Sequence, residues 1–263
     1  KKLKKQSKVI TILDNVISHE KRFFDKPFTK YFLKQNHGFV VMSSTVKNDL
    51  LSFLPDAKYI FHPHPLYNHF GGKINSTEAR KKLNIPAGKK IILFFGFIRD
   101  YKGLDLLIEA ISKSDDEYLG LICGECYGSF EKYQQQIEHL KIENKISLHI
   151  RYISDDDVPF FFSAADVCVL PYKSATQSGI TSVAYHFDVP VIATNVGGLK
   201  ETIQHNKNGL LIDYPSSEKI TEAIKKYFTE ELKTKFQNEI MKTKSQYSWD
   251  NLATEIINFG GQL

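Results

Sequence analysis

From Lys90 to Phe228 the chain alternates short apolar runs with segments of helical periodicity, and this alternation constrains its fold more than any other feature. Each apolar run has the length of one buried strand, and apolar residues recur at helical spacing in the segment that follows it. Repeats of this kind form a parallel sheet with helices on both faces. The sequence therefore predicts an α/β fold with a doubly wound, Rossmann-like sheet. The expected strands are residues 90–96, 118–123, 146–152, 167–170, 189–194 and 209–212, and the expected helices are residues 104–112, 130–140, 157–164, 178–187, 197–204 and 216–228.

The first part of the chain shows the same pattern with fewer elements. Strands are expected at 9–13 and 38–42, with a helix at 29–35 between them and a serine-capped helix through Phe53 after them. Residues 61–72 are rich in Pro, His, Asn and Gly and are typical of a linker. Two strands are too few for a whole domain, so we expect a truncated first domain.

These observations predict three segments. Residues 1–75 are expected to be the remnant of the first domain plus the linker, and residues 76–245 the main domain, which opens with a helix capped by Ser76 and Thr77. Residues 246–263 are expected to form a C-terminal helix with one apolar face. Because the chain starts abruptly on charged residues, we expect it to be part of a longer polypeptide.

The composition narrows the range of expected cellular locations and binding partners. The chain has 263 residues and a net charge of +5, with no apolar run that would cross a bilayer and no apolar signal-peptide core. Three cysteines suit a reducing compartment, so a cytoplasmic location is expected, and placement at the inner face of the membrane is left open. The lysines are scattered, which argues against a nucleic-acid partner.

The segment FFGFIRDYKGLDLLIEAI, residues 94–111, carries the first set of candidate binding residues. A buried strand runs there into a turn with Arg99 and Lys102, and a helix follows near Gly103. Ligands of open parallel sheets bind beyond the carboxyl ends of strands, and two cations beside a helix start would form an anion site. Two solvated surface charges are the alternative.

The segment ADVCVLPYKSATQSGITSVAYHFDVPVIATNVGGLKE, residues 165–201, carries the second set. Its TQSG stretch, from Thr176 through Gln177 and Ser178 to Gly179, opens an apolar helix. Small residues at a helix start expose backbone N–H groups, and the helix dipole favours negative charge there. This arrangement suits a pyrophosphate. The TQSG stretch and the later NVGG turn, residues 195–198, are each ordinary loop sequence when taken alone.

Together these two segments resemble the C-terminal domain of GT-B glycosyltransferases, specifically family 4, the glycosyl transferases group 1. The resemblance covers about residues 76–260 through FGxIRxYKGLDLLIEA, ADVxVLPY and PVIATNVGGLKE, and weakly extends back to Val9. It implies two facing Rossmann-like domains with a nucleotide sugar bound mainly by the second. It also implies that the helix at residues 249–259 crosses back to pack against the first domain.

The resemblance assigns donor-binding residues. Lys102 matches the lysine that holds the donor diphosphate. The family arginine after the strand glycine, Gly96, is replaced by Phe97, and Arg99 is our candidate substitute. The loop from Thr176 through Gln177 and Ser178 to Gly179 matches the part that meets the distal phosphate and the sugar. Tyr152 and Ile153 fall where the family backbone meets the nucleobase.

Two departures from the family pattern concern the sugar and the ribose. The family pair of glutamates around the loop and helix would fall at Ala175 and Val183, and neither is acidic. Gln177 or Thr176 would then bind the sugar. No replacement for the ribose contact stands out. Because some members of the family use a TQSG loop, the loss does not predict inactivity.

Candidate catalytic residues lie in the first segment. Asp14 follows the strand at 9–13, where many relatives place a histidine that faces the transferred sugar, and His19 comes shortly after it. A carboxylate or imidazole there would orient the acceptor or stabilise developing positive charge. A turn capped by Asp14 and a surface histidine are the competing interpretations.

Three other patterns are interpreted as structural. Cys123 and Cys126 form a CxxC sequence, but a structural zinc site needs four ligands and no second pair exists. His62, His64 and His69 are interpreted as linker residues, since the family needs no protein-bound metal. Residues 1–8 are interpreted as the exposed end of a helix, with a membrane-surface basic patch as the alternative.

The predicted function is glycosyl transfer from a nucleoside diphosphate sugar to a glycan or lipid acceptor. The resemblance implies retention of configuration and a role in glycan, lipopolysaccharide or capsule biosynthesis. No cofactor other than the donor substrate and no metal are expected, and peripheral membrane association is left open. The alternatives are a sugar-nucleotide 2-epimerase, whose acidic and histidine cluster is not evident, and a non-catalytic nucleotide-binding module.

Overall fold

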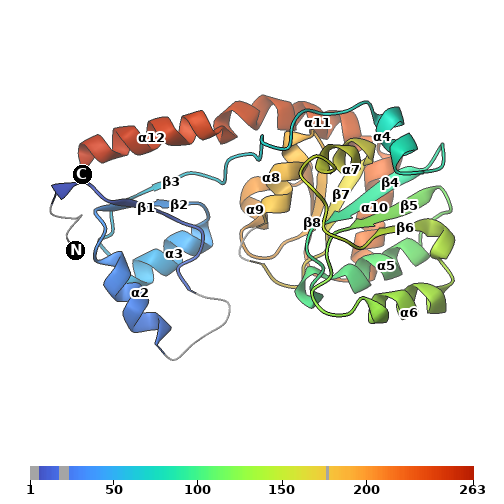
Figure 1. Ribbon diagram of the computed structural model, residues 1–263, viewed down its shortest axis with the longest axis horizontal. Helices are drawn as coiled ribbons and strands as arrows, with labels where there is room; N and C mark the ends of the chain where they lie inside the picture. Colours follow the sequence, from blue (N-terminus) through green and yellow to red (C-terminus); the bar gives the residue numbers. More distant parts are fainter. Residues whose placement is uncertain (1–5, 18–23, 176–177) are drawn as a thin grey trace. The chain divides into compact units, whose positions relative to one another are not determined.

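The computed structural model describes residues 6–17, 24–175 and 178–263, and it divides into two compact units (Figure 1). The first unit combines residues 1–65 with residues 245–263, and the second comprises Leu66–Lys244. Residues 66–75, which were expected to belong to the first segment with its linker, therefore lie in the second unit.

The second unit is built on a six-stranded, fully parallel sheet with the order β6-β5-β4-β7-β8-β9. This order runs outward in both directions from the centre, so the doubly wound α/β fold predicted from the sequence is confirmed. The strands are β4 (Lys90–Phe95), β5 (Tyr118–Cys123), β6 (Ile146–His149), β7 (Val167–Leu170), β8 (Val191–Thr194) and β9 (Gly209–Ile212).

Helices cover both faces of this sheet (Figure 1). Side chains of α5, α6, α10 and α11 join Ile92 and Phe94 of β4 in one buried cluster. On the other face, Phe95 packs against Phe161 and Phe162 of α7. The helices of this unit are α4 (Ser76–Lys82), η1 (Asp100–Lys102), α5 (Leu104–Ser112), α6 (Glu131–Leu140), η2 (Glu143–Lys145), α7 (Val158–Ala164), α8 (Gly179–His186), α9 (Leu199–Thr202), α10 (Ser217–Thr229) and α11 (Leu232–Thr243). The short helix η3 (Lys244–Tyr247) spans the boundary to the first unit.

Several boundaries differ from the sequence prediction for local reasons. Asn75, rather than Ser76 or Thr77, caps α4, because its side-chain oxygen accepts from the backbone N–H groups of Thr77 and Glu78. Strand β6 ends at His149, three residues earlier than expected. Helix α11 was not predicted from the sequence.

The first unit contains a three-stranded parallel sheet with the order β1-β2-β3, formed by β1 (Ile10–Leu13), β2 (Gly38–Val41) and β3 (Tyr59–Phe61). Helix α2 (Asp25–Leu33) begins four residues before the predicted start, and α3 (Ser44–Phe53) is capped by the Ser43 hydroxyl, as predicted. Strand β3 was not predicted, and its last residue, Phe61, was expected to begin the linker. It pairs instead with β2.

Helix α12 (Trp249–Gln262) completes the first unit from the far end of the sequence. Its Leu252 is buried with Val40 and Met42 of the β2 segment. The ring of Phe259 lies against Gly38, where an added Cβ would come within 2.6 Å of it. The apolar face of this helix therefore covers the sheet of the first unit.

Candidate functional site

The strand order of the second unit reverses between β4 and β7, which makes this point the switch point of the sheet. Chains leaving the carboxyl ends of these two strands turn to opposite sides, and open α/β sheets bind ligands in the resulting crevice. A cavity of about 230 Å³ lies at this edge. Its lining comes from the ends of β4, β5 and β6 and the start of α8: Phe95, Gly96, Phe97, Lys102, Gly124, Glu125, Tyr152, Ile153 and Ile180.

Five of the predicted donor-binding residues meet in this cavity, namely Gly96, Phe97, Lys102, Tyr152 and Ile153. They come from two different loops, after β4 and after β6, so the fold brings together residues that the sequence could only align one by one. Pockets for drug-sized ligands hold roughly 300–1,000 Å³, which makes this cavity one subsite rather than a complete site.

Lys102 is the buried cation of the site. Its side chain is only 9% exposed, and its ammonium group lies 5.7 Å from the centre of the Tyr172 ring. Among the described residues, no carboxylate forms an ion pair with it. Burial, and then the positive charge of Arg99, lower the pKa of Lys102 to about 8. A bound anion at this position would compensate the ammonium charge.

Glycines after Lys102 and after β5 allow the loops to approach each other. Gly103 has φ +70°, and an added Cβ would lie 2.0 Å from the Pro171 carbonyl oxygen at the end of β7. Gly124 has φ +136°, and an added Cβ would lie 2.2 Å from the Gly96 oxygen. L-residues with side chains rarely adopt these φ values, so glycine is required at both positions.

Arg99 lies beside the cavity without lining it. Its guanidinium carbon stands 4.4 Å from the centre of the Tyr127 ring, on the exposed side of the loop. Its charge still contributes to the lowered pKa of Lys102. The structure thus places Arg99 close enough to influence an anion electrostatically while its guanidinium rests on an aromatic ring.

The start of α8 forms the other wall. Ser178 precedes the helix, and its hydroxyl shares a hydrogen bond of 3.2 Å with the hydroxyl of Tyr172. The Thr194 hydroxyl donates to the Tyr172 carbonyl at 2.5 Å, which ties β8 to the same loop. Predicted residues Thr176 and Gln177 lie outside the described residues.

Tyr67 and Glu125 are residues of this region that sequence reasoning missed. The Tyr67 ring lies against Gly179, because a Cβ added there would be 3.2 Å from the ring and from its hydroxyl oxygen. Glu125 is the acidic residue in the cavity lining, and its backbone carbonyl accepts from Ile98 at 2.8 Å. The only sequence signal for Glu125 was its place in the turn directly after a buried strand.

The structure also describes Ala175 and Val183, the two positions at which the family pair of glutamates would fall. Val183 is 4% exposed on α8 and packs as a core residue, and Ala175 is half-buried before the undescribed loop residues. An acid in the cavity therefore comes from the β5 turn and not from α8.

The candidate catalytic residues belong to the first unit. Asp14 is exposed directly after β1, at the carboxyl edge of the three-stranded sheet. His19 lies outside the described residues.

The CxxC turn at residues 123–126 continues the parallel pairing of β4 and β5 beyond the ends of these strands. Cys123 is fully buried at the end of β5, and burial raises its pKa well above the usual thiol value. Ile98 and Cys126 form a parallel bridge, and all three cysteines are free thiols. Within the described ranges, no group of three or more His, Cys, Asp or Glu side chains is placed to hold a metal ion.

The linker histidines make local contacts. His62 is 2% exposed, its Nδ1 lies 2.6 Å from the Pro63 carbonyl oxygen, and its Nε2 lies 3.5 Å from the Asn251 amide. The His64 ring meets the Trp249 ring edge-on at 6.1 Å. The first two histidines therefore help to hold α12 in the first unit.

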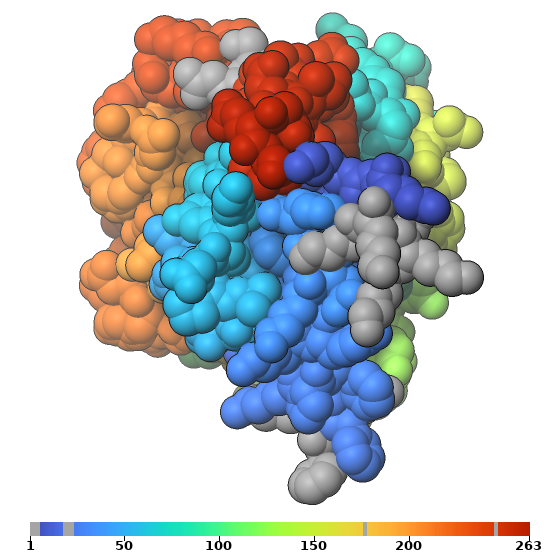
Figure 2. All heavy atoms as spheres, turned by 90° about the vertical axis from the view of Figure 1, so that its left-hand side faces the viewer, coloured from blue at the N-terminus to red at the C-terminus, as the bar shows by residue number. Residues whose placement is uncertain are grey.

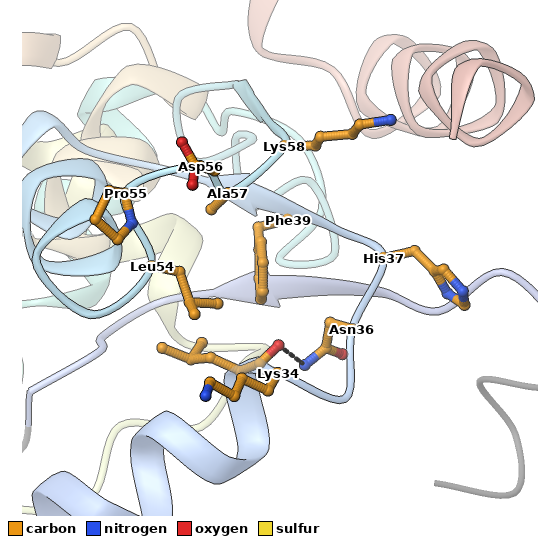
Figure 3. A pocket seen from close by; sticks show the side chains of 10 residues that line it. Lys34, Asn36, His37, Phe39, Leu54, Pro55, Asp56, Ala57 and Lys58 are labelled. Atoms are coloured by element: carbon orange, nitrogen blue, oxygen red, sulfur yellow. Dashed lines mark hydrogen bonds between the residues drawn. The ribbon is translucent and has the colours of Figure 1, made fainter.

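A second cavity, of about 350 Å³, lies in the first unit (Figure 3). It is lined by residues just before β2 and β3, with Phe39 and Leu54 facing it and the Asn36 amide donating to the Leu33 carbonyl at 3.3 Å. This is the amino edge of the parallel sheet, opposite the edge at which such sheets bind ligands. We therefore do not assign the donor to it.

A doubly wound parallel sheet with a buried lysine at its switch point defines a class of α/β protein that binds ligands beyond the carboxyl ends of its strands. The sequence profile of Glycosyl transferases group 1 matches residues 75–245, more than half of the chain. The chain belongs to this family.

Individual relatives agree with this assignment. A D-inositol 3-phosphate glycosyltransferase from Corynebacterium urealyticum is 28% identical over 196 residues, which cover 71% of this chain and 46% of the relative. The chain thus spans about half the length of this curated relative.

Solved structures share the fold. Anabaena HepE in complex with UDP superposes with a TM-score of 0.84 at 18% identity, covering 98% of this chain and 73% of HepE. WaaG, a glycosyltransferase involved in lipopolysaccharide biosynthesis, superposes with a TM-score of 0.73 at 19% identity, covering 97% of this chain and 80% of WaaG. These similarities confirm the GT-B type of α/β fold that the sequence resemblance predicted for the chain.

In the described ranges, no helix is long and apolar enough to cross a membrane.

Proposed function

We propose that this chain binds a nucleoside diphosphate sugar in its second unit and supports transfer of the sugar to a glycan or lipid acceptor. The single observation that carries the proposal is Lys102, a buried ammonium group without a described carboxylate partner, at the switch point of a parallel sheet. Departure of a nucleoside diphosphate develops negative charge on the diphosphate. A desolvated cation that is already in place stabilises this charge most effectively.

The rest of the cavity fits the other parts of such a donor. Tyr152 and Ile153 line it beside the ends of β5 and β6 and offer an apolar wall to a nucleobase. The start of α8 presents its dipole from the neighbouring wall, where Ile180 lines the cavity. The UDP named in the HepE structure supports a uridine nucleotide as the first donor to test.

The finer assignments follow from the family. We propose a retaining reaction, with Asp14 and His19 on the acceptor side, in the biosynthesis of glycans, lipopolysaccharide or capsule. The WaaG similarity supports a lipopolysaccharide-type acceptor, and the inositol phosphate relatives support a small phosphorylated one. The reaction needs the donor as its only small-molecule partner besides the acceptor, in a cytoplasmic setting that extends to the inner face of the membrane.

Nucleotide binding tests the proposal directly. The thermal unfolding midpoint of the chain is measured with UDP, GDP and ADP, for the wild type and for Lys102→Met. We expect one diphosphate to raise the wild-type midpoint and to leave the variant unchanged. Equal stabilisation of both proteins would overturn the role of Lys102.

A second candidate function, a non-catalytic nucleotide-binding module, is favoured by the buried Val183 at a position where the family carries an acid. Donor hydrolysis separates the two. A chain that binds the nucleotide but neither hydrolyses nor transfers the sugar, even within its full-length polypeptide, is such a module.

A further inference from the structure

Within the described ranges, four helices begin after a serine at the N-cap position, and one of these serines differs from the others. The hydroxyls of Ser43, Ser216 and Ser248 each accept from the backbone N–H three positions later, at 3.1–3.2 Å, and so cap α3, α10 and α12. Ser178 before α8 has a similar extended backbone, with φ −140° and ψ 115°, but its hydroxyl makes no capping bond to a described residue. The hydroxyl that would cap α8 is therefore used elsewhere.

The capped helices and α8 begin in different surroundings. Helix α12, the red segment of Figure 2, lies beside the blue residues of β1, where Ile10 is 3.5 Å from a Cβ added at Gly260. This helix packs within its own unit. The start of α8, in contrast, lies at the candidate donor cavity, because Ile180 of its first turn lines that cavity together with Lys102. Of the four serines, the one that leaves its helix uncapped is thus the one beside this cavity.

Tyr172 holds the Ser178 hydroxyl. The two hydroxyl oxygens are 3.2 Å apart, and Tyr172 is only 2% exposed. Burial raises the pKa of Tyr172 above its usual value, so its hydroxyl stays protonated and can donate to Ser178. The Tyr172 carbonyl accepts from the Thr194 hydroxyl, and its ring meets the Tyr101 ring edge-on at 6.3 Å. These contacts fix the position of the Tyr172 hydroxyl, and the Ser178 hydroxyl is held with it.

This arrangement leaves backbone N–H groups available at the start of α8. The first N–H groups of a helix have no partner within the helix. The N–H of Thr181 is satisfied by the Ser178 carbonyl oxygen at 3.2 Å, but no oxygen in the described ranges accepts from the N–H of Gly179 or Ile180. Because an N-cap side chain accepts from the second or third N–H, a capping Ser178 hydroxyl would occupy this end of the helix in place of an anion.

The same end of α8 lies close to the buried Lys102 ammonium group. A Cβ added at Gly96 would be 3.5 Å from the Lys102 Nζ and 3.1 Å from the Ile180 side chain, so both residues adjoin the end of β4. A cation and the positive end of a helix dipole both favour negative charge. An anion between them would therefore contact a buried ammonium group and an uncapped helix start.

We propose that Tyr172 is a positioning residue: it holds the Ser178 hydroxyl away from α8 and so keeps the Gly179 and Ile180 N–H groups open for the distal phosphate of a nucleoside diphosphate sugar. This role rests on the proposed function. It also gives Ser178 a different part from the one that the sequence suggested, because the serine contributes by leaving its helix uncapped rather than by binding the sugar. The bound phosphate then supplies the cap that the ligand-free helix lacks.

A double-mutant cycle tests the proposal with the 263-residue chain. The variants are Tyr172→Phe, Ser178→Ala and the double Tyr172→Phe/Ser178→Ala. Calorimetric titration measures their Kd for UDP and UMP, or for the GDP and GMP or ADP and AMP pair where the wild type prefers that base. The matched control is Tyr227→Phe, which removes a buried tyrosine hydroxyl that donates to the Asp166 carbonyl at 2.8 Å and does not line the cavity.

Tyr172→Phe is expected to bind the diphosphate about fivefold more weakly than the wild type, because the freed Ser178 hydroxyl caps α8 and a cap of ordinary strength must be displaced. The monophosphate, which lacks the distal phosphate, should lose less affinity. In the Ser178→Ala background the same Tyr172→Phe change should alter the diphosphate affinity by less than about twofold, since no hydroxyl is left to cap the helix. The Tyr227→Phe control should bind as the wild type does.

Two results of the titrations would overturn the proposal. A similar loss from Tyr172→Phe in both backgrounds would mean that the tyrosine supports the structure without acting through Ser178. Equal losses for the diphosphate and the monophosphate would mean that the distal phosphate is not involved. Either result leaves the proposed function standing, whereas a wild type that binds none of UDP, GDP and ADP would overturn both.

A measurement without nucleotide detects the cap itself. Amide hydrogen exchange of Ile180 and Thr181, followed by NMR, should slow in Tyr172→Phe, because the Ser178 hydroxyl then protects the first turn of α8. Exchange in the double variant should remain as fast as in the wild type. Unchanged exchange in Tyr172→Phe would overturn the proposal whether or not the nucleotide binds.

Discussion

Lys102 and the lysines of α2 carry the same ammonium group in opposite surroundings. Lys102 is 9% exposed among the loops of the second unit, and its pKa falls to about 8. Lys26 and Lys30 are exposed on the surface of the first unit. The buried lysine is suited to holding a single oriented anion, whereas the exposed lysines interact weakly with any one ion, because a desolvated charge interacts strongly and a solvated charge is screened.

The largest expected effect comes from removing the buried charge. Lys102→Met should lower kcat for sugar transfer by roughly 10²–10³-fold, as the loss of one preorganised group that stabilises developing charge commonly does. Lys225→Met, on the exposed side of α10, is the matched control and should leave kcat unchanged. Steady-state kinetics of sugar transfer measure both, and similar rates for the two variants would remove the distinction between buried and exposed lysines.

A pair of glycines tests how tightly the loops around Lys102 are packed. Gly103 and Gly88 have φ values of +70° and +76°, but only at Gly103 would a Cβ meet other atoms. Gly88→Ala should cost about 1 kcal/mol of unfolding free energy, from backbone conformation alone. Gly103→Ala should cost at least about 3 kcal/mol, because the Pro171 carbonyl must also move. Urea unfolding compares them, and equal losses would mean that the close approach is unimportant.

The buried charge should also reduce the stability of the ligand-free protein. The pKa of Lys102 lies below its ordinary value of 10.5, so the unfolded chain binds more protons between pH 8 and 10.5 and the stability from this group rises with pH there. At pH 7 Lys102→Met should therefore be more stable than the wild type, by about 1–3 kcal/mol. The difference should shrink as the pH approaches 10.5. A variant less stable at pH 7 would contradict this origin of the lowered pKa.

A smaller effect is expected at Glu125. Its carboxylate is the acid of the cavity lining and would accept hydrogen bonds from the ribose hydroxyls, in place of the family glutamate that Val183 replaces. Glu125→Gln should raise the KM for the donor by roughly 3–10-fold, since hydrogen bonds to a charged group are stronger than neutral ones. Glu143→Gln, outside the cavity, serves as the control. A 2′-deoxy nucleotide that loses the same affinity with the wild type and with the variant would exclude the ribose contact.

The smallest effect is expected from salt. Raising ionic strength should change nucleotide binding at the buried Lys102 little, because screening over about 10 Å at 0.1 M salt acts mainly on exposed charges. Nucleotide titrations across a salt series measure the effect, and a steep loss of affinity would show that exposed charges dominate binding.

The sequence allowed the main sheet to be predicted because its strands are buried on both faces. Strands such as β5 and β7 contain continuous runs of buried residues, which stand out in the sequence. Strand β3 was missed because it has three residues and only partial burial. Helix α11 was missed because it follows α10 through Glu231 at φ +50°, without a glycine or proline to mark the break.

The candidate site was predictable only where one residue acts through its own position in a motif. Lys102 and Gly96, which line the candidate cavity, were proposed in this way. Tyr67 and Glu125 were not, because their places depend on loops that meet in space, such as the approach of Gly124 to Gly96. The position of the Arg99 guanidinium over Tyr127 likewise depends on two loops.

Helix α12 makes the first unit discontinuous in sequence, so the second unit is topologically an insertion within it. Two covalent connections therefore join the units, near Pro65 and near Ser245. A chain that stops after Lys244 would keep all the described residues of the donor cavity and lose the cover over Val40 and Met42. Folding of the first unit therefore depends on contacts of high sequence separation, because the β2 segment meets α12 only after the whole second unit has been passed along the chain.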